Sequence, residues 1–323
     1  MTRYDRQIAV LPDARQSQQK LAAARILVVG AGGLASPVLQ YLVGAGVGHI
    51  RLVDGDVVSL SNMHRQTIYR DDDIGRPKAE RAARHMAALN PDCQITPVAA
   101  YLTPDKIAEQ AAGVDLVLDC ADSFAVSYSL SDYCRGQLPL VSASVVGLSG
   151  YCGGFCAQAP SLRAVFPDLP RRFGSCADDG VLGPVVGVIG GLQAQMALAI
   201  LTGLDPSPLG QLVTYDAGAN RFGGFRFDAA DEPGSAPHFI GKTEITADDF
   251  VIDLRHENEG PLVTAAAHRI APADITPAVP IANAARVVLC CQSGQRAWMA
   301  AETMSNFWPG PIALLALGAT ENE

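Results

Sequence analysis

The chain has 323 residues, of which 49% are hydrophobic and 18% charged, so it is long enough for one large domain and a smaller one, each with its own core. Its net charge of -9 comes without a block of Lys and Arg, which argues against nucleic acid as a partner because phosphate backbones require clustered cations. A polar N-terminus, apolar runs broken by Gly and Gln, and eight cysteines without a secretory signal predict a cytoplasmic protein with reduced thiols and no membrane span.

The first long segment, residues 25–54, predicts a βαβ unit. An apolar run leads into a glycine turn, a helix and a second apolar run that ends at Asp54. Two further apolar runs, in 112–122 and 138–147, are bounded by turn residues, as is typical of buried parallel strands. The predicted fold class is therefore α/β, with a doubly wound Rossmann-like sheet in the first part of the chain.

The glycine turn of this unit has the sequence GAGGLA and contains Gly30, Gly32 and Gly33. Because glycine lacks Cβ, backbone N–H groups and the N-terminus of the following helix can approach a phosphate closely. Asp54, at the end of the second strand, is placed to accept hydrogen bonds from ribose hydroxyls. This pattern fits NAD, FAD or ATP equally well, and a glycine turn that only packs a helix on the sheet is the structural alternative.

The segment after Asp54 distinguishes between these nucleotides. Polar and cationic residues follow the ribose-binding position, and another cation lies in the N-terminal arm: Asn62, Arg65, Gln66, Lys78 and Arg6. Hydride transfer has little use for so many donors, whereas displacement at a phosphoryl group needs cations that hold the triphosphate as pyrophosphate leaves. Adenylation is favoured over a dehydrogenase reaction, although a solvated charged face is the alternative for single residues such as Arg65 and Lys78.

Adenylation with ATP also requires a ligand for Mg²⁺. Asp122 follows another predicted strand and faces the same crevice at the carboxyl ends of the sheet. We therefore expect Asp122 to bind the magnesium ion.

The ordered segments RYDRQI, GAGGLASPVLQYLVGAGVGHIRLVDGDVVSLSNMHRQ, DIGRPKAERAA, DLVLDCAD and GVLGPVVGVIGGLQAQMALAILTG resemble the MoeB/ThiF/HesA family, bacterial relatives of ubiquitin-activating enzymes. The resemblance covers residues 3–228. It implies a homodimer that binds ATP and Mg²⁺ and adenylates the C-terminal Gly-Gly carboxylate of a ubiquitin-fold sulfur-carrier protein. It also implies roles for individual residues. Those assigned to the nucleotide are Gly33, Asp54, Asp56, Asn62, Gln66 and Lys78.

The same resemblance makes Arg65 an arginine finger that reaches the ATP of the neighbouring subunit, with Arg6 helping from the N-terminal arm. Asp122 would hold magnesium near the reacting carboxylate. The chain departs from the family pattern at several positions. Ser161 and Ala164 stand where most members carry the first of two Cys-x-x-Cys pairs, and no second pair follows, so we expect no structural zinc. The Asn and Arg expected after Asp122 are replaced by Ser123 and Ser127, and the last glycine of the turn is Ala35.

Cys176 lies in a Gly-rich polar stretch, RRFGSCADDGVLGP, which predicts a loop. The neighbouring Arg171 and Arg172 favour a lowered thiol pKa. In the family that this chain resembles, the loop often bears the cysteine that forms a thioester or acyl disulfide with the carrier. The alternative is a spectator thiol on a disordered loop.

A linker is predicted at 229–242, because this stretch is rich in Pro, Gly, Ala and acids and has no hydrophobic period. It separates a first domain, 1–228, from a second one, 243–323. Two apolar runs, 248–255 and 285–291, predict buried strands, and 295–308 predicts a helix. The second domain is expected to be a small α/β domain.

Two cysteines end the later of these strands. Cys290 is expected to point into the core, whereas Cys291 precedes a turn and a helix whose backbone N–H groups and positive end favour a thiolate or persulfide. The sequence CQSGQR, from Cys291 to Arg296, resembles the Cys-x-x-Gly-x-Arg loop of rhodanese domains, which carry sulfur as a cysteine persulfide. Asp253 with Arg255, and the segment around His268, resemble other landmarks of that fold. A Cys-x5-Arg phosphatase loop is disfavoured, because the spacing is too short.

Together these features predict a chain that adenylates a ubiquitin-like sulfur carrier ending in Gly-Gly and then transfers persulfide sulfur to give a thiocarboxylate. The persulfide on Cys291 would attack the acyl adenylate directly or by way of Cys176. The expected partners are the carrier and a persulfide donor such as a cysteine desulfurase. The alternatives are a related adenylating enzyme that acts on a peptide or tRNA, and a non-catalytic binding module that has kept only the fold.

Overall fold

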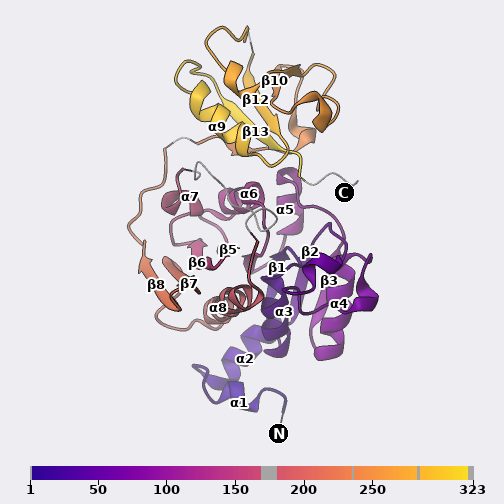
Figure 1. The fold of residues 1–323 in the computed structure, drawn as a ribbon. Helices are drawn as coiled ribbons and strands as arrows, with labels where there is room; N and C mark the ends of the chain where they lie inside the picture. The colour runs from indigo at the N-terminus through magenta and orange to yellow at the C-terminus, as the bar shows by residue number, and fades with distance from the viewer. Residues whose placement is uncertain (1, 169–179, 235, 282–283, 319–323) are drawn as a thin grey trace. The chain divides into compact units, whose positions relative to one another are not determined.

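The computed structural model describes residues 2–168, 180–234, 236–281 and 284–318 (Figure 1). The chain divides into two compact units. The large unit comprises Met1–Leu102 and Ala108–Glu232, and the small unit comprises Thr103–Ile107 and Pro233–Glu323. Cys176, Arg171 and Arg172 lie outside the described residues.

The large unit is built on an eight-stranded sheet with the order β3-β2-β1-β4-β5-β6-β7-β8. Its strands are β1 (Arg25–Val29), β2 (His49–Val53), β3 (Gln94–Val98), β4 (Leu116–Asp119), β5 (Pro139–Val146), β6 (Ser149–Cys156), β7 (Gln211–Asp216) and β8 (Arg221–Arg226). Neighbours from β3 to β5 pair in parallel, and those from β5 to β8 pair antiparallel. The predicted α/β class with a Rossmann-like parallel half is confirmed, but the sheet is mixed, because short turns after β5 and β7 allow hairpins where a parallel pair would need a helical crossover.

Eight α-helices accompany this sheet in the described part of the chain (Figure 1). They are α1 (Asp5–Ile8), α2 (Ala14–Ala23), α3 (Ala35–Gly44), α4 (Lys78–Leu89), α5 (Ile107–Gln110), α6 (Phe124–Cys134), α7 (Leu162–Val165) and α8 (Gly183–Thr202). Helices α3 and α8 pack on each other, and α8 also contacts β5 and β6. A Cβ on Gly190 would lie 2.5 Å from Pro37 Cγ and 2.7 Å from the Leu34 carbonyl oxygen, so glycine permits the close contact of the two helices.

Helix α8 is long and apolar enough to cross a membrane by length and composition alone. More than half of its apolar window, 56%, is nevertheless buried inside the protein. Its buried side chains, which include Val185, Ile189 and Ala197, belong to the main hydrophobic core together with side chains of β1 and α3. It is therefore a core helix of the large unit.

The small unit contains a five-stranded parallel sheet with the order β11-β10-β12-β13-β9. The strands are β9 (His238–Phe239), β10 (Asp249–Asp253), β11 (His268–Arg269), β12 (Arg286–Cys291) and β13 (Ile312–Ala316), and α9 (Gln295–Met304) packs on β12 and β13. The two predicted strands and the predicted helix of this region are confirmed. The stretch predicted as a linker, 229–242, includes β9, because Phe239 is buried against the small unit and its ring lies 6.3 Å from that of Trp298.

Candidate functional site

The parallel half of the large sheet has a switch point between β1 and β4, where the strand order reverses, and open α/β sheets bind ligands at the carboxyl ends of the strands there. A cavity of about 730 Å³ lies at this place. The structure brings together nine of the predicted site residues in its wall: Gly30, Gly32, Gly33, Asp54, Asp56, Arg65, Gln66, Lys78 and Asp122. This volume is within the range of small-molecule sites.

In the turn after β1, glycine occurs at three positions for different structural reasons. Gly30 has a φ of +93°, and a Cβ there would lie 2.6 Å from the Cys120 carbonyl oxygen. A Cβ on Gly33 would lie 2.8 Å from Val186 Cγ1, so this glycine permits close packing on α8. At Gly32 a Cβ would only reach ordinary contact distance, 3.5 Å from Gln66 Nε2. Glycine at this last position is not required by the protein's own packing, so it leaves room for a ligand in the cavity.

Asp54 is fixed beside the glycine turn by two backbone donors. The N–H groups of Ala31 and Asp56 donate to its two carboxylate oxygens at 2.7 and 2.8 Å. Burial raises the pKa of Asp54 despite these bonds. Each oxygen retains a further lone pair, so the oriented carboxylate can still accept from hydroxyl groups.

Tyr69 supports the same turn and was not predicted from the sequence. Its hydroxyl group is buried and donates to the carbonyl oxygens of Ala31, at 2.6 Å, and Lys78, at 3.2 Å. It therefore joins the glycine turn to the start of α4. A single tyrosine in a polar segment carries no signal that would have revealed this role.

Lys78 and Asp56 form an ion pair at the edge of the cavity, with Nζ 2.7 Å from Oδ2. The Lys78 residue is only 5% exposed, and the Tyr101 hydroxyl donates to the other oxygen of Asp56 at 2.7 Å. Partial burial alone would raise the pKa of Asp56, but the hydrogen bonds from Lys78 and Tyr101 outweigh it and lower the pKa. Asp56 thus holds the buried ammonium group in the cavity wall.

Gln66 lines the cavity and has one buried, unsatisfied polar atom. Its Nε2 donates to Asn62 Oδ1 at 3.2 Å, whereas its buried Oε1 has no hydrogen-bond partner among the described residues. A buried polar atom without a partner is costly. Asn62 is not among the residues that line the cavity; its side chain accepts a hydrogen bond from Gln66, and its predicted contact with the nucleotide stays a prediction.

The two predicted arginines are placed differently. Arg65 lines the cavity of its own chain, and its Nη1 lies 2.9 Å from His64 Nε2 and 3.4 Å from the Ser61 carbonyl oxygen. Arg6 is exposed on α1 and does not line the cavity. A role of Arg65 in a neighbouring subunit's site, and any role of Arg6 with the nucleotide, stay predictions.

Asp122 follows β4 on a turn that a buried carboxylate stabilises. Asp119, the last residue of β4, accepts from Ser142 Oγ at 2.7 Å and from the Ala121 N–H at 3.2 Å. Burial raises the pKa of Asp119 to about 6. Asp122 itself is exposed to the cavity, and no described residue donates a hydrogen bond to it. Its carboxylate oxygens are of the kind that Mg²⁺ prefers.

The substituted positions after Asp122 are also in the cavity wall. Ser123 precedes α6, and the Ser127 hydroxyl donates to the Ser123 carbonyl oxygen at 3.2 Å, a bond local to the helix. Farther along the wall lie aromatic and apolar side chains, and the rings of Tyr151 and Phe166 lie 5.1 Å apart. Two further carboxylates, Asp168 and Asp216, also line the cavity, so charged and apolar side chains are mixed in its wall.

The position of the missing Cys-x-x-Cys pair contains a hydrogen-bonded contact. The backbone N–H and the hydroxyl group of Ser161 each donate to the Glu232 carboxylate at 2.6 Å. Within the described ranges, no group of three or more His, Cys, Asp or Glu residues could hold a metal ion.

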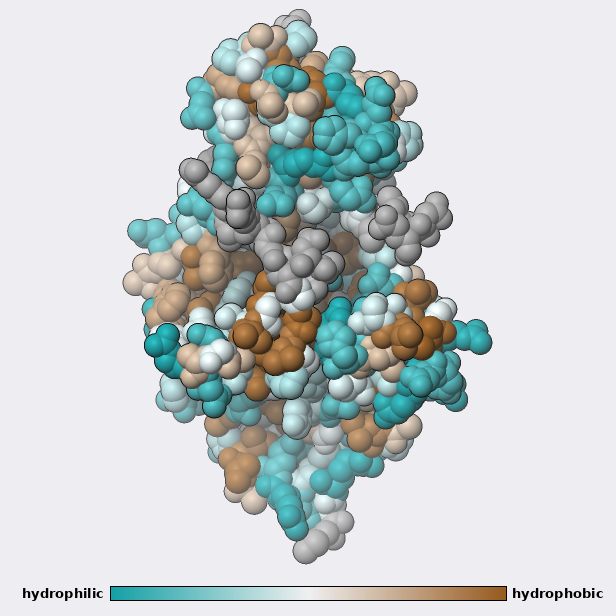
Figure 2. Space-filling model, viewed as in Figure 1, coloured by the Kyte–Doolittle hydropathy of each residue, from teal (hydrophilic) through white to brown (hydrophobic). Residues whose placement is uncertain are grey.

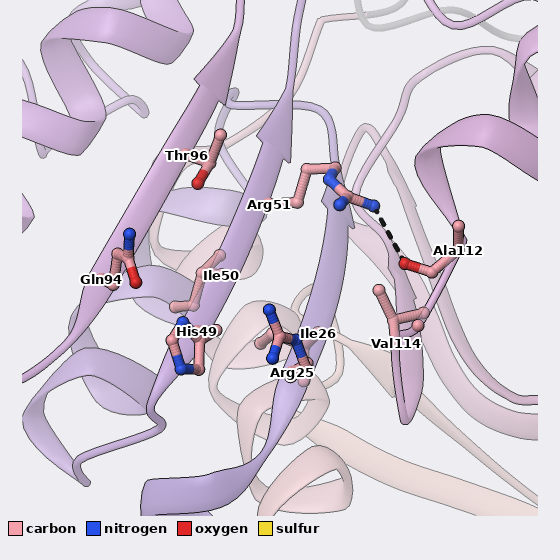
Figure 3. Close-up of a pocket in the computed structure, with 10 residues that line it drawn as sticks. Arg25, Ile26, His49, Ile50, Arg51, Gln94, Thr96, Ala112 and Val114 are labelled. Carbon is pink, nitrogen blue, oxygen red and sulfur yellow. Dashed lines mark hydrogen bonds between the residues drawn. The ribbon is translucent and has the colours of Figure 1, made fainter.

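A smaller cavity of about 290 Å³ lies toward the amino ends of β1 and β2 and is lined by Arg25, His49 and Arg51 (Figure 3). Arg51 donates to the Ala112 carbonyl oxygen at 3.4 Å, beyond the end of α5 (Figure 3). This cavity has no part of the glycine turn and no carboxylate in its wall. It does not meet the needs of a nucleotide with magnesium.

In the small unit, Cys291 ends β12 and the loop after it leads into α9. Its Sγ accepts hydrogen bonds from the N–H groups of Gly294, at 3.1 Å, and Ala297, at 3.4 Å. Gly294 has a φ of +89°, and a Cβ there would lie 2.7 Å from the Phe239 ring, so the loop requires glycine. Cys290 belongs to the hydrophobic core, and burial raises its pKa to about 12.

Most charged residues around this loop form ion pairs, and Asp253 is shared by Arg255 and, at 3.8 Å, by Arg269. Both Arg296 Nη atoms donate to Glu259, with Nη1 2.7 Å from Oε2, and Nη1 also donates to the Leu254 carbonyl oxygen at 3.2 Å. Arg255 Nε and Nη2 donate to the buried Asp253 at 3.0 and 2.8 Å. Glu259 was not singled out from the sequence; the acidic stretch HENEG gave only a weak signal. His268 lies on β11, and its ring stacks on Phe250 at 4.5 Å.

The family model described as "ThiF family" matches residues 4–235, which is most of the chain. The chain belongs to the ThiF family. Three relatives illustrate the membership. The SAMP-activating enzyme E1 of Haloferax volcanii is 39% identical over 220 residues (67% of this chain and 82% of the relative), and the molybdopterin-synthase adenylyltransferase of Escherichia coli is 41% identical over 224 residues (67% and 88%). The adenylyltransferase and sulfurtransferase UBA4 of Yarrowia lipolytica is 43% identical over 211 residues (62% and 52%).

This ThiF-family chain is accordingly an enzyme of the adenylyltransferase class. Among solved structures, MccB of Escherichia coli in complex with MccA-N7isoASN matches with a TM-score of 0.65 at 19% identity, over 72% of this chain and 74% of MccB. At this identity the similarity shows the fold alone. The matched family region, which ends at residue 235, corresponds to the large unit.

Proposed function

We propose that the large unit uses ATP to adenylate the C-terminal carboxylate of a ubiquitin-like sulfur-carrier protein that ends in Gly-Gly. The observation that carries this proposal is one cavity of about 730 Å³ in which the glycine turn lies together with Asp54, Lys78, Arg65 and Asp122. The Haloferax volcanii and Escherichia coli relatives have names that refer to SAMP and to molybdopterin synthase, which supports a carrier of this class.

In the proposed reaction a carboxylate oxygen of the carrier attacks the α-phosphorus of ATP, and the bond to the bridging oxygen of pyrophosphate breaks. The glycine turn would bind phosphate through backbone N–H groups, and Lys78 and Arg65 would stabilise the negative charge that develops on the leaving group. Asp122 is the carboxylate that we assign to Mg²⁺, which would neutralise phosphate charge when bound.

We further propose that the small unit is a rhodanese-like domain and that Cys291 carries sulfur as a persulfide. Backbone N–H groups and the N-terminus of α9 surround its Sγ, an arrangement that favours an anionic sulfur. The terminal sulfur of the persulfide would attack the acyl adenylate and release AMP, and a thiol would then open the acyl disulfide to give the thiocarboxylate. By the alternative route, the carrier would first pass from the adenylate to Cys176 as a thioester, with release of AMP, and the persulfide would then displace Cys176. The donor of the sulfur would be a cysteine desulfurase or a comparable persulfide protein.

The proposed enzyme works as a cytoplasmic homodimer. Figure 2 shows hydrophobic patches on the visible face of the large unit. Among its exposed apolar residues are Val146, Leu148 and Leu182, at 37, 49 and 50% exposure. These three lie close together, because the turn between β5 and β6 pairs with the segment before α8 through Gly147. Such a patch is typical of subunit interfaces.

The test is ATP–pyrophosphate exchange that depends on a Gly-Gly carrier. Asp122→Ala should reduce exchange roughly 10²–10³-fold, as is usual when a group that stabilises transition-state charge is lost. The matched control is Asp72→Ala, which removes an exposed carboxylate outside the cavity and should leave exchange unchanged. Exchange that needs a peptide or tRNA instead of the carrier would favour the alternative adenylating enzymes. Equal exchange by both variants would contradict the assignment of Asp122.

A further inference from the structure

The cysteine loop of the small unit contains one charged residue, Arg296, in the sequence CQSGQR. Its guanidinium group is held by Glu259 through two hydrogen bonds, one from each terminal nitrogen, and by the Leu254 carbonyl oxygen. Both charged side chains are about one-third exposed, at 31 and 29%. The loop that surrounds Cys291 is therefore flanked by an ion pair with no net charge.

Glu259 is held in place by its own turn. The short 3-10 helix η5 (Glu257–Glu259) ends with this residue, and the His256 backbone N–H donates to its Oε2 at 2.8 Å. Hydrogen bonding from Arg296 lowers the pKa of Glu259 to about 2. The carboxylate thus stays ionised and stays beside Arg296 throughout the physiological pH range.

The positive potential at Cys291 comes from the backbone and, weakened by Glu259, from Arg296, whose guanidinium group also interacts with the Cys291 sulfur. The N–H groups of Gly294 and Ala297 donate to Sγ, and α9 begins at Gln295. A helix N-terminus is equivalent to about half of a positive charge. This potential suits a single thiolate or persulfide charge, but a donor with two negative charges would need a cation that is not already neutralised.

We propose that Glu259 is a specificity-determining residue of the cysteine loop, which neutralises Arg296 and so discriminates against sulfur donors that carry two negative charges. This inference rests on the proposed role of Cys291 as a sulfur carrier. It assigns to the loop a donor with at most one charge on its transferable sulfur group, such as a persulfide presented by a protein. Inorganic thiosulfate, a dianion, is the donor that the loop disfavours.

The loading reaction has the same form for either kind of donor. The Cys291 thiolate attacks the outer sulfur of the donor, a new Sγ–S bond forms, and the donor's own S–S bond breaks with its electron pair leaving on the remainder. Thiosulfate would leave as sulfite, and an aromatic thiosulfonate, a monoanion, would leave as sulfinate. These two small donors transfer the same atom but differ in charge.

The experiment uses the full chain and measures cyanide-dependent thiocyanate formation with thiosulfate and with benzenethiosulfonate. Glu259→Gln keeps the shape of the side chain and a hydrogen-bond acceptor for the His256 N–H, but releases the charge of Arg296. We expect the KM for thiosulfate to fall about tenfold, which corresponds to about 1.4 kcal/mol, and the KM for the monoanion to fall less. The matched control is Glu257→Gln in the same turn, which removes a carboxylate not bonded to Arg296 and should change neither KM.

A second variant removes the cation. Arg296→Gln leaves the Glu259 charge unbalanced, so it should raise the KM for thiosulfate more than the KM for benzenethiosulfonate. Equal changes for the two donors, or no change in Glu259→Gln, would overturn the charge discrimination while leaving sulfur transfer by Cys291 intact. If neither donor adds a sulfur atom to Cys291 in any variant, as judged by intact mass with Cys291→Ser as reference, both the proposed sulfur function and this inference fail.

Discussion

The cavity of the large unit and the cysteine loop of the small unit both lie at the carboxyl ends of parallel strands, and both contain ion pairs, but only the cavity also has a charged side chain without a partner among the described residues. In the cavity, Asp122 has no hydrogen-bond donor and Gln66 Oε1 has no partner among the described residues, beside an opening of about 730 Å³. At the loop, Arg296 is paired with Glu259 and Arg255 with Asp253, and Cys291 is fully buried.

This difference corresponds to the size and charge of the group that we propose each site to bind. A nucleotide with a metal ion is large and multiply charged, so its site needs polar groups that remain available and a volume to receive it. A persulfide adds one atom with one charge to a thiol. Its site needs only N–H groups that fix the sulfur, and unpaired side-chain charges there would attract unsuitable anions.

The strongest test of the difference between the two sites is to substitute each of the two adjacent cysteines in turn. Cys291→Ser should abolish sulfur transfer to the carrier and leave ATP–pyrophosphate exchange unchanged, because the cavity does not contain this residue. Cys290→Ser should retain transfer but lower the free energy of unfolding of the small unit by about 1–2 kcal/mol, because it buries a hydroxyl group in an apolar cluster. Thiocarboxylate formation is measured by mass spectrometry of the carrier. Sulfur transfer that persists in Cys291→Ser, or that is lost in Cys290→Ser, would contradict the roles assigned to the two cysteines.

A second prediction concerns the backbone that builds the cavity. Gly30→Ala should lower the free energy of unfolding of the large unit by at least about 2 kcal/mol, because of the positive φ and the contact with the Cys120 carbonyl oxygen. Gly32→Ala, two residues on, should keep the stability of the large unit and weaken only nucleotide binding. Chemical denaturation and ATP titration measure the two effects. If both variants lose the same stability, glycine at position 32 serves packing instead of the ligand.

The smallest expected effect is the pH dependence of the Glu259 ion pair. The folded-state pKa of Glu259, about 2, is below its ordinary value of 4.5, so the pair stabilises the fold above about pH 4.5 and this contribution is lost as the pH falls toward 2. Because the pair is partly exposed, the contribution should be below about 1 kcal/mol. The difference in unfolding free energy between the native chain and Glu259→Gln should therefore shrink on acidification. A difference that grows as the pH falls would show that the carboxylate is not held by Arg296.

Local patterns in the sequence were sufficient to predict much of the secondary structure. The glycine turn after an apolar run predicted β1 and α3, and the apolar run that ends in two cysteines predicted β12, because strand and helix periods are properties of neighbouring residues. The antiparallel half of the large sheet was not predicted, and β9 was taken for part of a linker. A two-residue strand has no period of its own, and β9 is defined by its backbone pairing with β13 and by the burial of Phe239.

The sequence by itself determined which residue types could form the proposed nucleotide site, because glycines, Asp54 and the following cations occur in an order that favours binding of a phosphate. Only the tertiary structure shows which of these residues contact one another. Asn62 is hydrogen-bonded to Gln66, Asp56 forms an ion pair with Lys78, and the Tyr69 hydroxyl group is hydrogen-bonded to the glycine turn. Arg296 is likewise paired with Glu259. The residues of such pairs are far apart or follow no period in the chain, and their contacts depend on distances that only the packed fold defines.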